Sequence, residues 1–389
     1  DEADAAYARS DFSKAARAYD RAIKTAPKEV TPEGYGQRAS IFAIEKRYQD
    51  GLRWITGVAE AQYPDHVVIR EQKAVVLAGL PGRRKDAVDV AEAVLKEKAE
   101  SSTSHKIVGD FYFAARSKPE RVALAYDAYL KQVSQDPQTH VKAGFTYLEL
   151  GRRSARSDEA RDYYEKAEGH LEPVARGRSA GLRANANKGL CAAYAGQAQN
   201  GAPKQSTRAV TLCEQVIGEP RAMRNDPSPY FNVGRAYLAL RQYPKALDSA
   251  NAYIALRPAT AAGYNLRGEI YFAQDKLGQA EGQFVRAQQL DASDPRTRIN
   301  LGKTYARQKR YPQAIDELSA ALATVPGDVT LLAELATVYL EKGDASQAAA
   351  QAVKGLAQKG SENDTRLGLL AARARYAAGD LDRAASWYK

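Results

Sequence analysis

Residues 299–326 show the clearest hydrophobic pattern, two runs of apolar side chains at helical spacing. The positions that share one face in the first run are Leu301, Gly302 and Tyr305. The polar break QKRYP follows, and its Pro312 suits the first turn of a second helix, where an N–H is not needed. The apolar positions of the second run are Ala314, Leu318 and Ala321. The pattern predicts two amphipathic helices joined by a short turn and ended by Pro326-Gly327.

The same hairpin recurs every 34 residues through residues 227–360. Three residue types keep this period: Gly234, Gly268 and Gly302, with Ala336 in the fourth place; Tyr237, Tyr271, Tyr305 and Tyr339; and Ala246, Ala280, Ala314 and Ala348. One hairpin cannot bury its own apolar face, whereas stacked copies bury a continuous core. The sequence therefore predicts an all-α, right-handed superhelical solenoid.

The pattern is looser upstream, where residues 1–225 carry degenerate copies with insertions near 151–158 and 197–207. Residues 226–389 carry the regular repeats, the last of which is truncated inside its second helix at Trp387-Tyr388. The chain as a whole predicts about ten repeats. Because it begins at Asp1 and ends without a polar capping helix, we expect the natural chain to extend beyond both ends.

Charge and composition exclude several classes of function. The net charge is +10, but acidic and basic residues are interleaved, which favours a solvated basic surface over nucleic-acid binding. No apolar run approaches the ~20 residues of a membrane-spanning helix. The four histidines, which form no metal-binding motif in the sequence, are His66, His105, His140 and His170. No catalytic motif is present, so we expect neither an enzyme nor a cofactor.

The residues L-G-x-x-Y, then A-x-x-x-L/F-x-x-A, then P, at a spacing of 34, resemble the tetratricopeptide repeat (TPR) family. The resemblance is strong in residues 227–360 and weaker before them. It departs from the family pattern at Ala292, which takes the place of the closing Pro, and at Ala336, which replaces Gly. The resemblance implies a protein-binding scaffold, in which the first helices of the repeats line a concave groove.

The resemblance also implies which side chains face the groove. The transferred positions are Phe231, Asn232, Arg235, Asn265, Glu269, Phe272, Arg296, Asn300, Lys303 and Arg307. Asn232 and Asn300 hold the position at which peptide-binding members often bond the ligand backbone, and the Arg and Lys residues make the wall basic. The fourth repeat adds Glu334 and Glu341. We expect an acidic or extended peptide as partner, although the Lys-x-x-x-Arg spacing of a carboxylate clamp comes four residues late.

Family alignment places the two cysteines, Cys191 and Cys213, on facing positions of one hairpin. A disulfide between them is therefore one alternative, if the compartment is oxidising. The other, which we place first, is a pair of reduced, buried thiols that behave as small apolar residues.

The sequence thus favours a non-catalytic scaffold that binds a partner peptide or helix during assembly of a bacterial multiprotein complex, without a small-molecule substrate. A periplasmic or outer-membrane-associated location is favoured over the cytoplasm. Two alternatives stay open. One is a regulatory or nucleic-acid-associated protein that uses its basic surface, and the other is a scaffold that associates with itself.

Overall fold

The computed structural model describes residues 2–154, 157–219, 226–358, 361, 364–381 and 384. Within these residues every regular element is a helix, so the all-α class predicted from the sequence is confirmed. The chain divides into two compact units: Asp1–Arg153 with Asp162–Gly189, and Ser154–Arg161 with Leu190–Lys389. The predicted end of the last repeat at Trp387-Tyr388 lies outside the described residues.

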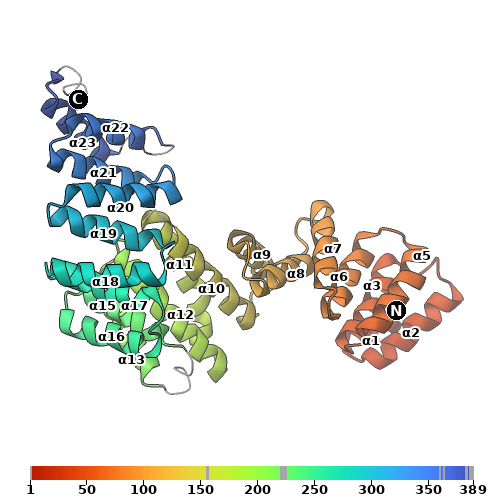
Figure 1. The fold of residues 1–389 in the computed structure, drawn as a ribbon. Coiled ribbons are helices and arrows are strands. Elements are labelled where there is room, and N and C mark those ends of the chain that lie inside the picture. Colours follow the sequence, from red (N-terminus) through yellow and green to blue (C-terminus); the bar gives the residue numbers. More distant parts are fainter. Residues whose placement is uncertain are drawn as a thin grey trace. The chain divides into compact units, whose positions relative to one another are not determined.

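The first unit is built from consecutive helices that pack in antiparallel pairs (Figure 1). Its helices are α1 (Glu2–Ala8), α2 (Phe12–Thr25), α3 (Pro32–Ile44), α4 (Tyr48–Trp54), the π-helical turn η1 (Ile55–Ala59), α5 (Glu60–Gln62), α6 (Val67–Gly79), α7 (Arg84–Glu97), α8 (Ser102–Ala114), α9 (Pro119–Gln132), α10 (Pro137–Arg153) and α11 (Ser157–Ala175). The first turn of α11 belongs to the second unit, and the helix that follows, α12 (Ala180–Gln199), likewise contributes residues to both units.

The second unit continues with the regular hairpins, which stack one on the next in Figure 1. Its helices are α13 (Gln205–Ile217), α15 (Ser228–Ala239), α16 (Tyr243–Leu256), α17 (Ala261–Ala273), α18 (Leu277–Leu290), α19 (Pro295–Arg307), α20 (Tyr311–Thr324), α21 (Val329–Lys342), α22 (Ala345–Leu356) and α23 (Thr365–Ala377). The stacked helix-turn-helix architecture expected from the 34-residue period is thereby confirmed.

The repeating glycines let the two helices of a hairpin approach closely. A Cβ atom on Gly268 would lie 2.5 Å from Phe284, and one on Gly302 would lie 2.6 Å from Leu318. Phe284 and Leu318 come from the second helix of the same hairpin and are fully buried, which removes most of their apolar surface from water. The repeating alanines of the second helices are also fully buried: Ala246, Ala280, Ala314 and Ala348.

The turns inside the regular hairpins share one backbone geometry. A left-handed residue follows each first helix, with φ of 56° at Arg241, 59° at Asp275 and 60° at Lys309, each two positions beyond the helix, and 91° at Gly343, one position beyond α21. The next N–H then donates to the carbonyl of the repeating tyrosine, as from Arg310 to Tyr305 at 2.8 Å. This hydrogen bond ends the first helix in a Schellman-type cap and sets where the second helix begins.

Candidate functional site

Three first helices of the second unit, α15, α17 and α19, carry all ten residues that the sequence predicts at the groove. The structure places three of them, Phe272, Lys303 and Arg307, around one hollow of about 470 Å³. The hollow is also lined by Ala306, Lys309, Tyr311, Glu334 and Glu341. It therefore combines an aromatic ring with charges of both signs, which suits a polar, extended ligand better than an apolar one.

The three predicted asparagines differ in their hydrogen bonding. Asn265 is buried and joined to Thr297, because its Nδ2 donates to Oγ1 at 2.8 Å and Oγ1 donates to its Oδ1 at 3.2 Å. Asn300 Nδ2 donates to Glu269 Oε1 at 3.3 Å. Asn232 is buried, with 7% of its surface exposed, yet its side chain makes no hydrogen bond to another described residue. Of the three, Asn232 thus keeps an uncommitted amide among the described residues.

Arg235 follows Asn232 by one helical turn on α15. Its guanidinium lies 5.7 Å from the centroid of the Phe231 ring, and that ring packs on Tyr253 at 5.5 Å. No described carboxylate lies within ion-pair distance of Arg235. Burial raises the pKa of the half-buried Glu269, and the positive charge of Arg235 opposes that rise. Helix α15 therefore presents an amide and a cation on successive turns.

The other predicted cations are paired with carboxylates. Lys303 Nζ lies 3.6 Å from Glu334 Oε1, and Arg307 Nη1 lies 3.0 Å from Asp275 Oδ1. Arg296 is held by Asp294, which caps the start of α19, at 3.0 Å. The wall that the sequence indicated as basic is thus of mixed charge.

Sequence reasoning missed the partners that neutralise this wall. Arg307 and Asp275 are 32 residues apart in sequence. Glu334 and Arg366 have the same separation, and Arg366 Nη2 lies 3.0 Å from Glu334 Oε1. Opposite charges spaced by 31 or 32 residues, on successive first helices or in the turns that follow them, were the signal that could have revealed these pairs. The residues in contact are slightly closer in sequence than one full repeat.

The two cysteines are joined in the structure. Cys191 on α12 and Cys213 on α13 form a disulfide with a Cα–Cα distance of 5.1 Å, and both are fully buried. The reduced pair that we placed first from the sequence is therefore not the state in the structure. The physical reason is that the two helices of this hairpin bring the cysteines face to face within bonding reach.

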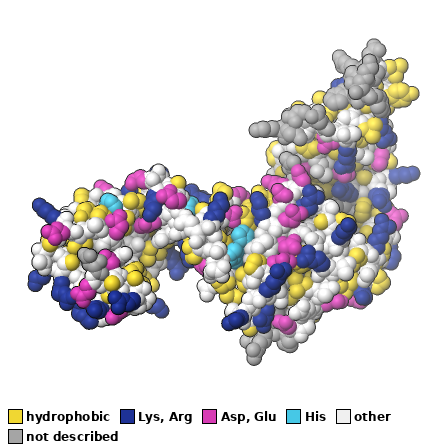
Figure 2. Space-filling view, turned by 180° about the vertical axis from the view of Figure 1, so that it is seen from behind, with side chains coloured by type: hydrophobic (Ala, Val, Ile, Leu, Met, Phe, Trp, Pro, Cys, Tyr) yellow, Lys and Arg dark blue, Asp and Glu magenta, His cyan; other side chains and the backbone are white. Residues whose placement is uncertain are grey.

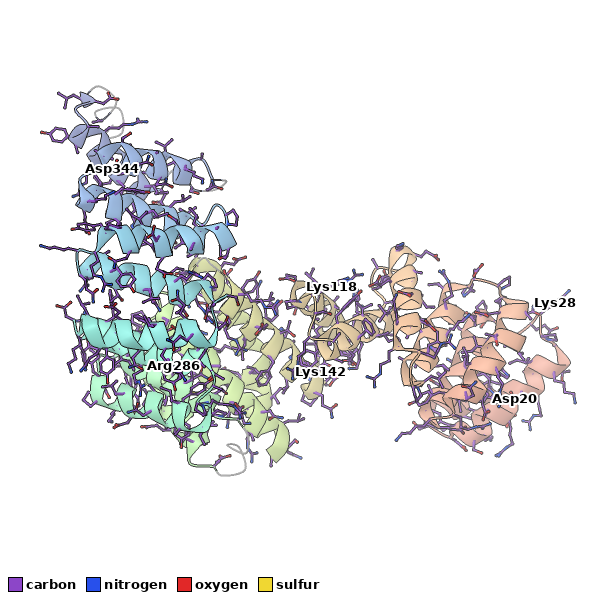
Figure 3. All side chains as sticks on the ribbon, viewed as in Figure 1. Asp20, Lys28, Lys118, Lys142, Arg286 and Asp344 are labelled. Carbon is purple, nitrogen blue, oxygen red and sulfur yellow. A yellow bond between two sulfur atoms is a disulfide. The ribbon has the colours of Figure 1, made fainter. Side chains whose placement is uncertain are left out.

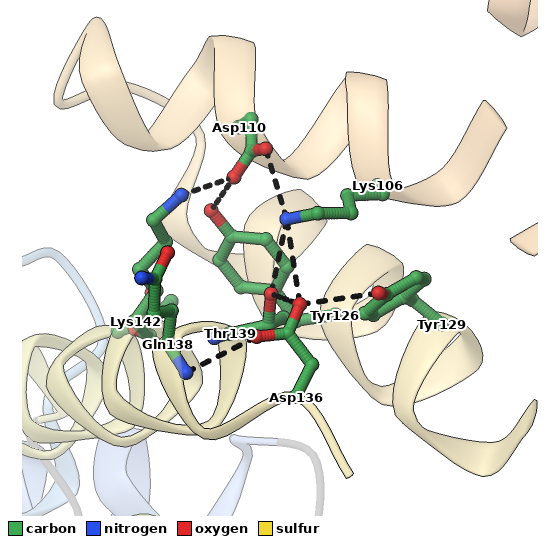
Figure 4. Close-up of polar contacts among 9 residues, drawn as sticks. Lys106, Asp110, Tyr126, Tyr129, Asp136, Gln138, Thr139 and Lys142 are labelled. Carbon is green, nitrogen blue, oxygen red and sulfur yellow. Dashed lines mark hydrogen bonds and ion pairs between the residues drawn. The ribbon is translucent and has the colours of Figure 1, made fainter. Parts of the chain in front are cut away.

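A polar cluster in the first unit joins α8, α9 and α10 (Figure 4). Asp110 accepts from Lys142 Nζ at 2.6 Å, from Lys106 Nζ at 3.1 Å and from Tyr126 at 2.9 Å. Although burial raises the pKa of Asp110, the two lysines outweigh it and hold that pKa below its ordinary value. Every polar group of Asp110 is satisfied, so the cluster ties successive hairpins together rather than offering a ligand site.

Two of the histidines that the sequence analysis treated as unconnected are neighbours. His140 on α10 and His170 on α11 lie with their Nδ1 atoms 3.1 Å apart, and His170 also contacts Asp127 Oδ1 at 3.1 Å. Tyr147 donates to the other oxygen of Asp127 and stacks on His170, and Lys166 lies above its ring. Within the described residues no group of His, Cys, Asp and Glu is arranged to hold a metal ion. Nor does any described helix have the length and apolarity needed to cross a membrane.

Comparison with known proteins identifies one family. A family model described as "Tetratricopeptide repeat" matches residues 1–66, 232–295 and 299–364, about half of the chain. Among curated proteins, Heat shock protein STI1 of Saccharomyces cerevisiae is 29% identical over 80 residues, or 21% of this chain and 14% of that protein. The Cell division cycle protein 27 homolog of Caenorhabditis elegans is 25% identical over 131 residues, or 34% of this chain and 16% of that protein. The chain thus spans about a sixth or less of these relatives.

Solved structures with a similar fold include yeast Tom70, at 14% identity and a TM-score of 0.47, with 99% of this chain and 89% of that chain covered. They also include PilW, a type IV pilus biogenesis factor, at 18% identity and a TM-score of 0.45, with 53% of this chain and 90% of that chain covered.

Proposed function

Because the chain belongs to the tetratricopeptide repeat family, whose members generally mediate protein–protein interactions, we propose that it is a non-catalytic scaffold that holds an extended, acidic peptide along the first helices of its second unit. The observation that carries the proposal is the uncommitted amide of Asn232 one turn from Arg235. An amide side chain both donates to and accepts from a peptide backbone, and an adjacent guanidinium binds a carboxylate in two parallel hydrogen bonds.

The hollow between α17, α19 and α21 would extend this site by two repeats. Its Arg307–Asp275 pair is exposed on both sides, and such pairs contribute little to stability. An incoming carboxylate therefore competes with Asp275 on nearly equal terms. The Phe272 ring, 5.0 Å from the Arg307 guanidinium, supplies the apolar contact beside that cation.

The proposal is tested with a fluorescein-labelled peptide of alternating Glu and Leu, and with the same peptide carrying Lys for Glu. Fluorescence anisotropy compares the wild type with the triple variant Arg235→Glu, Lys303→Glu, Arg307→Glu. We expect the acidic peptide to bind the wild type and to lose about tenfold or more in affinity for the variant.

A matched control reverses three exposed cations on second helices, Lys245→Glu, Arg286→Glu and Lys354→Glu, and circular dichroism verifies that all variants fold. It should bind as the wild type does. Equal binding of the acidic peptide to the two triple variants would refute the groove.

We also propose that the complex served is a bacterial one of the cell envelope. The Cys191–Cys213 disulfide supports this location, because cytosolic thiols are generally kept reduced whereas the periplasm is oxidising. Alkylation of free thiols in intact cells, followed by a mass measurement, checks the proposal. Unmodified cysteines are expected, and quantitative alkylation of Cys191 and Cys213 would place the chain in a reducing compartment.

A second candidate function rests on the exposed face of α2. Cations recur there at helical spacing at Lys14, Arg17, Arg21 and Lys24, and Lys28 follows in the turn after the helix; all five are exposed. Figure 2 shows Lys and Arg side chains gathered at the lower left, where the N-terminal helices lie, and Figure 3 labels Lys28 near the end of α2. Glu2 approaches both Lys14 and Arg21, at 3.5 and 3.2 Å, so the stripe is partly neutralised.

Such a stripe would bind nucleic-acid phosphates through a salt-dependent, sequence-independent attraction. Titration of labelled duplex and single-stranded DNA at several salt concentrations tests it. Tight binding that weakens steeply with salt would favour this second function over the peptide scaffold alone, and binding absent at low salt would exclude it.

A further inference from the structure

We propose that a pocket in the first unit, between α8, α9 and α10, binds the carboxyl-terminal residue of a partner peptide when that residue has an apolar, preferably aromatic, side chain. The pocket has a volume of about 550 Å³, which is in the range of sites that bind small ligands. It lies within one unit and does not depend on the groove of the second unit.

The floor of the pocket is apolar, and each of the three helices contributes to it. Phe113 comes from the end of α8, Pro119 and Val122 from the start of α9, and Phe145 from the middle of α10. Phe113 packs against Tyr126 with ring centroids 6.1 Å apart, which holds its ring in place. A floor with two phenylalanines favours an aromatic guest, because aromatic pairs gain more than their buried area alone provides.

Two of the three hydroxyl groups that line the pocket, those of Tyr112 and Thr146, already donate hydrogen bonds. Tyr112 donates to Glu92 Oε1 at 3.1 Å, and Thr146 Oγ1 donates to the carbonyl O of Lys142 at 2.9 Å. A guest side chain therefore meets no unsatisfied donor from Tyr112 or Thr146, and a polar guest would gain no hydrogen bond from either.

The rim is rich in guanidinium groups. Arg152 and Arg153 share a single carboxylate, Glu149, at 3.6 and 2.7 Å. Arg116 has no carboxylate within ion-pair distance among the described residues, and its side chain is exposed. Three guanidiniums face one carboxylate, so the rim is complementary to an added anion.

The turn that carries Arg116 is well defined. Arg116 is left-handed, with φ of 49°, and its N–H donates to the carbonyl O of Phe113 at 3.1 Å. Lys118, labelled in Figure 3, follows in the same turn, and its Nζ lies 4.7 Å from the centroid of the Tyr112 ring. A cationic rim beside an aromatic floor fits a carboxylate attached one residue away from an apolar side chain, which is the chemistry of a free carboxyl terminus.

The test uses the peptide acetyl-Ala-Ala-Ala-Phe as the free acid, its carboxyl-terminal amide, and N-acetylphenylalanine as a free small acid. Binding to the full chain is measured by isothermal titration calorimetry and by ligand-observed NMR. N-acetylphenylalanine should bind with a dissociation constant of about 1 mM, given the usual affinity per atom of a small ligand. The peptide acid should bind at least as tightly, and about tenfold more tightly than its amide, because only the acid meets the guanidiniums as an anion.

The diagnostic variant is Arg116→Glu, which changes an exposed turn residue and leaves the floor intact. It should reduce the preference for the acid over the amide by about tenfold. Lys131→Glu, on the exposed surface of α9, makes the same change of charge outside the pocket and should bind as the wild type does. Equal affinity of acid and amide for the wild type, no saturable binding of either, or identical behaviour of the two variants would overturn the proposal. Tighter binding of N-acetylphenylalanine than of the peptide acid would overturn the peptide as its natural ligand.

Discussion

His140 and His170 share a hydrogen bond between their Nδ1 atoms, which lie 3.1 Å apart. At the two outer ends, His140 Nε2 lies 3.0 Å from the carbonyl O of Ser134, and His170 Nε2 lies 3.1 Å from Asp127 Oδ1. A carbonyl and a carboxylate only accept, so the two Nε2 atoms are the donors at these outer ends. The histidine pair therefore links the turn between α9 and α10 to Asp127 on α9.

Loss of this contact should destabilise the first unit. His170→Gln removes the imidazole that faces both His140 Nδ1 and Asp127 Oδ1, which should lower the free energy of unfolding by about 1–2 kcal/mol. Urea denaturation of the wild type and the variant at one pH measures the loss.

His105 supplies the matched control for the histidine pair. Its Nε2 lies 2.8 Å from the carbonyl O of Ala99, six residues earlier in the sequence. His140 Nε2 makes the same contact with the carbonyl O of Ser134, but no second histidine faces His105. His105→Gln should therefore lose less free energy of unfolding than His170→Gln. Equal losses in the two variants would show that the histidine pair adds nothing beyond a single histidine.

Asp110 should stabilise the first unit only while it is ionised. Its pKa is held below the ordinary value, so its contribution is present above about pH 4 and is lost as pH falls through its lowered, folded-state pKa. Because both Asp110 and Lys142 are about one-third exposed, solvent screens their pair and we expect Asp110→Asn to lose about 1 kcal/mol at neutral pH. Thermal melts at neutral and strongly acidic pH check this.

The corresponding control is Asp89→Asn, which breaks a fully solvated i,i+4 pair with Lys85 at 3.1 Å. No measurable loss is expected there. A loss for Asp110→Asn that stayed the same at acidic pH would show that packing, rather than charge, is the cause.

Two glycines of one hairpin should respond in opposite directions to the same substitution. Gly268→Ala places a Cβ against the buried ring of Phe284, which should destabilise the second unit by about 1–3 kcal/mol. Gly282→Ala lies on the exposed face of α18 with nothing within 4 Å, and should stabilise it by up to about 1 kcal/mol through helix propensity. Urea midpoints of the two variants give the comparison, and a shift of the same sign in both would contradict it.

Reduction of the Cys191–Cys213 disulfide should destabilise the second unit. The bond closes a loop with a sequence separation of 22 residues, for which the loss of chain entropy in the unfolded state is worth about 3 kcal/mol. Calorimetric melts with and without a reducing agent measure the effect. The double variant Cys191→Ala, Cys213→Ala should melt like the reduced protein and be insensitive to the reductant; sensitivity in that variant would mean that the reductant acts elsewhere.

Periodicity was sufficient to locate the hairpins because close packing depends on one residue at each position. The glycine at the Gly302 position recurs in three of the four regular repeats, the buried alanine at the Ala314 position recurs in all four, and both leave a signal in the sequence. The structure therefore confirmed the fold class without correction. Contacts that use a residue only once leave no such signal.

The chemistry of the groove could be predicted only in part for that reason. Aligning equivalent positions 34 residues apart identified Lys303 and Arg307 as neighbours of the groove, but the atoms that touch them belong to Glu334 and Asp275, 31 and 32 residues away. His140 and His170 are 30 residues apart in a degenerate region, so their pairing follows from the local helix packing and from no repeat pattern.

The covalent link between α12 and α13 also gives the second unit a direction of assembly. In a stack each hairpin contacts mainly its neighbours, so folding starts at one hairpin and spreads to the next. The disulfide keeps α12 and α13 together when the other hairpins open, so this hairpin remains as a template on which they can fold again. The second unit is therefore expected to unravel from α23 toward α12 and to re-form in the reverse order, with its cross-linked hairpin as the seed.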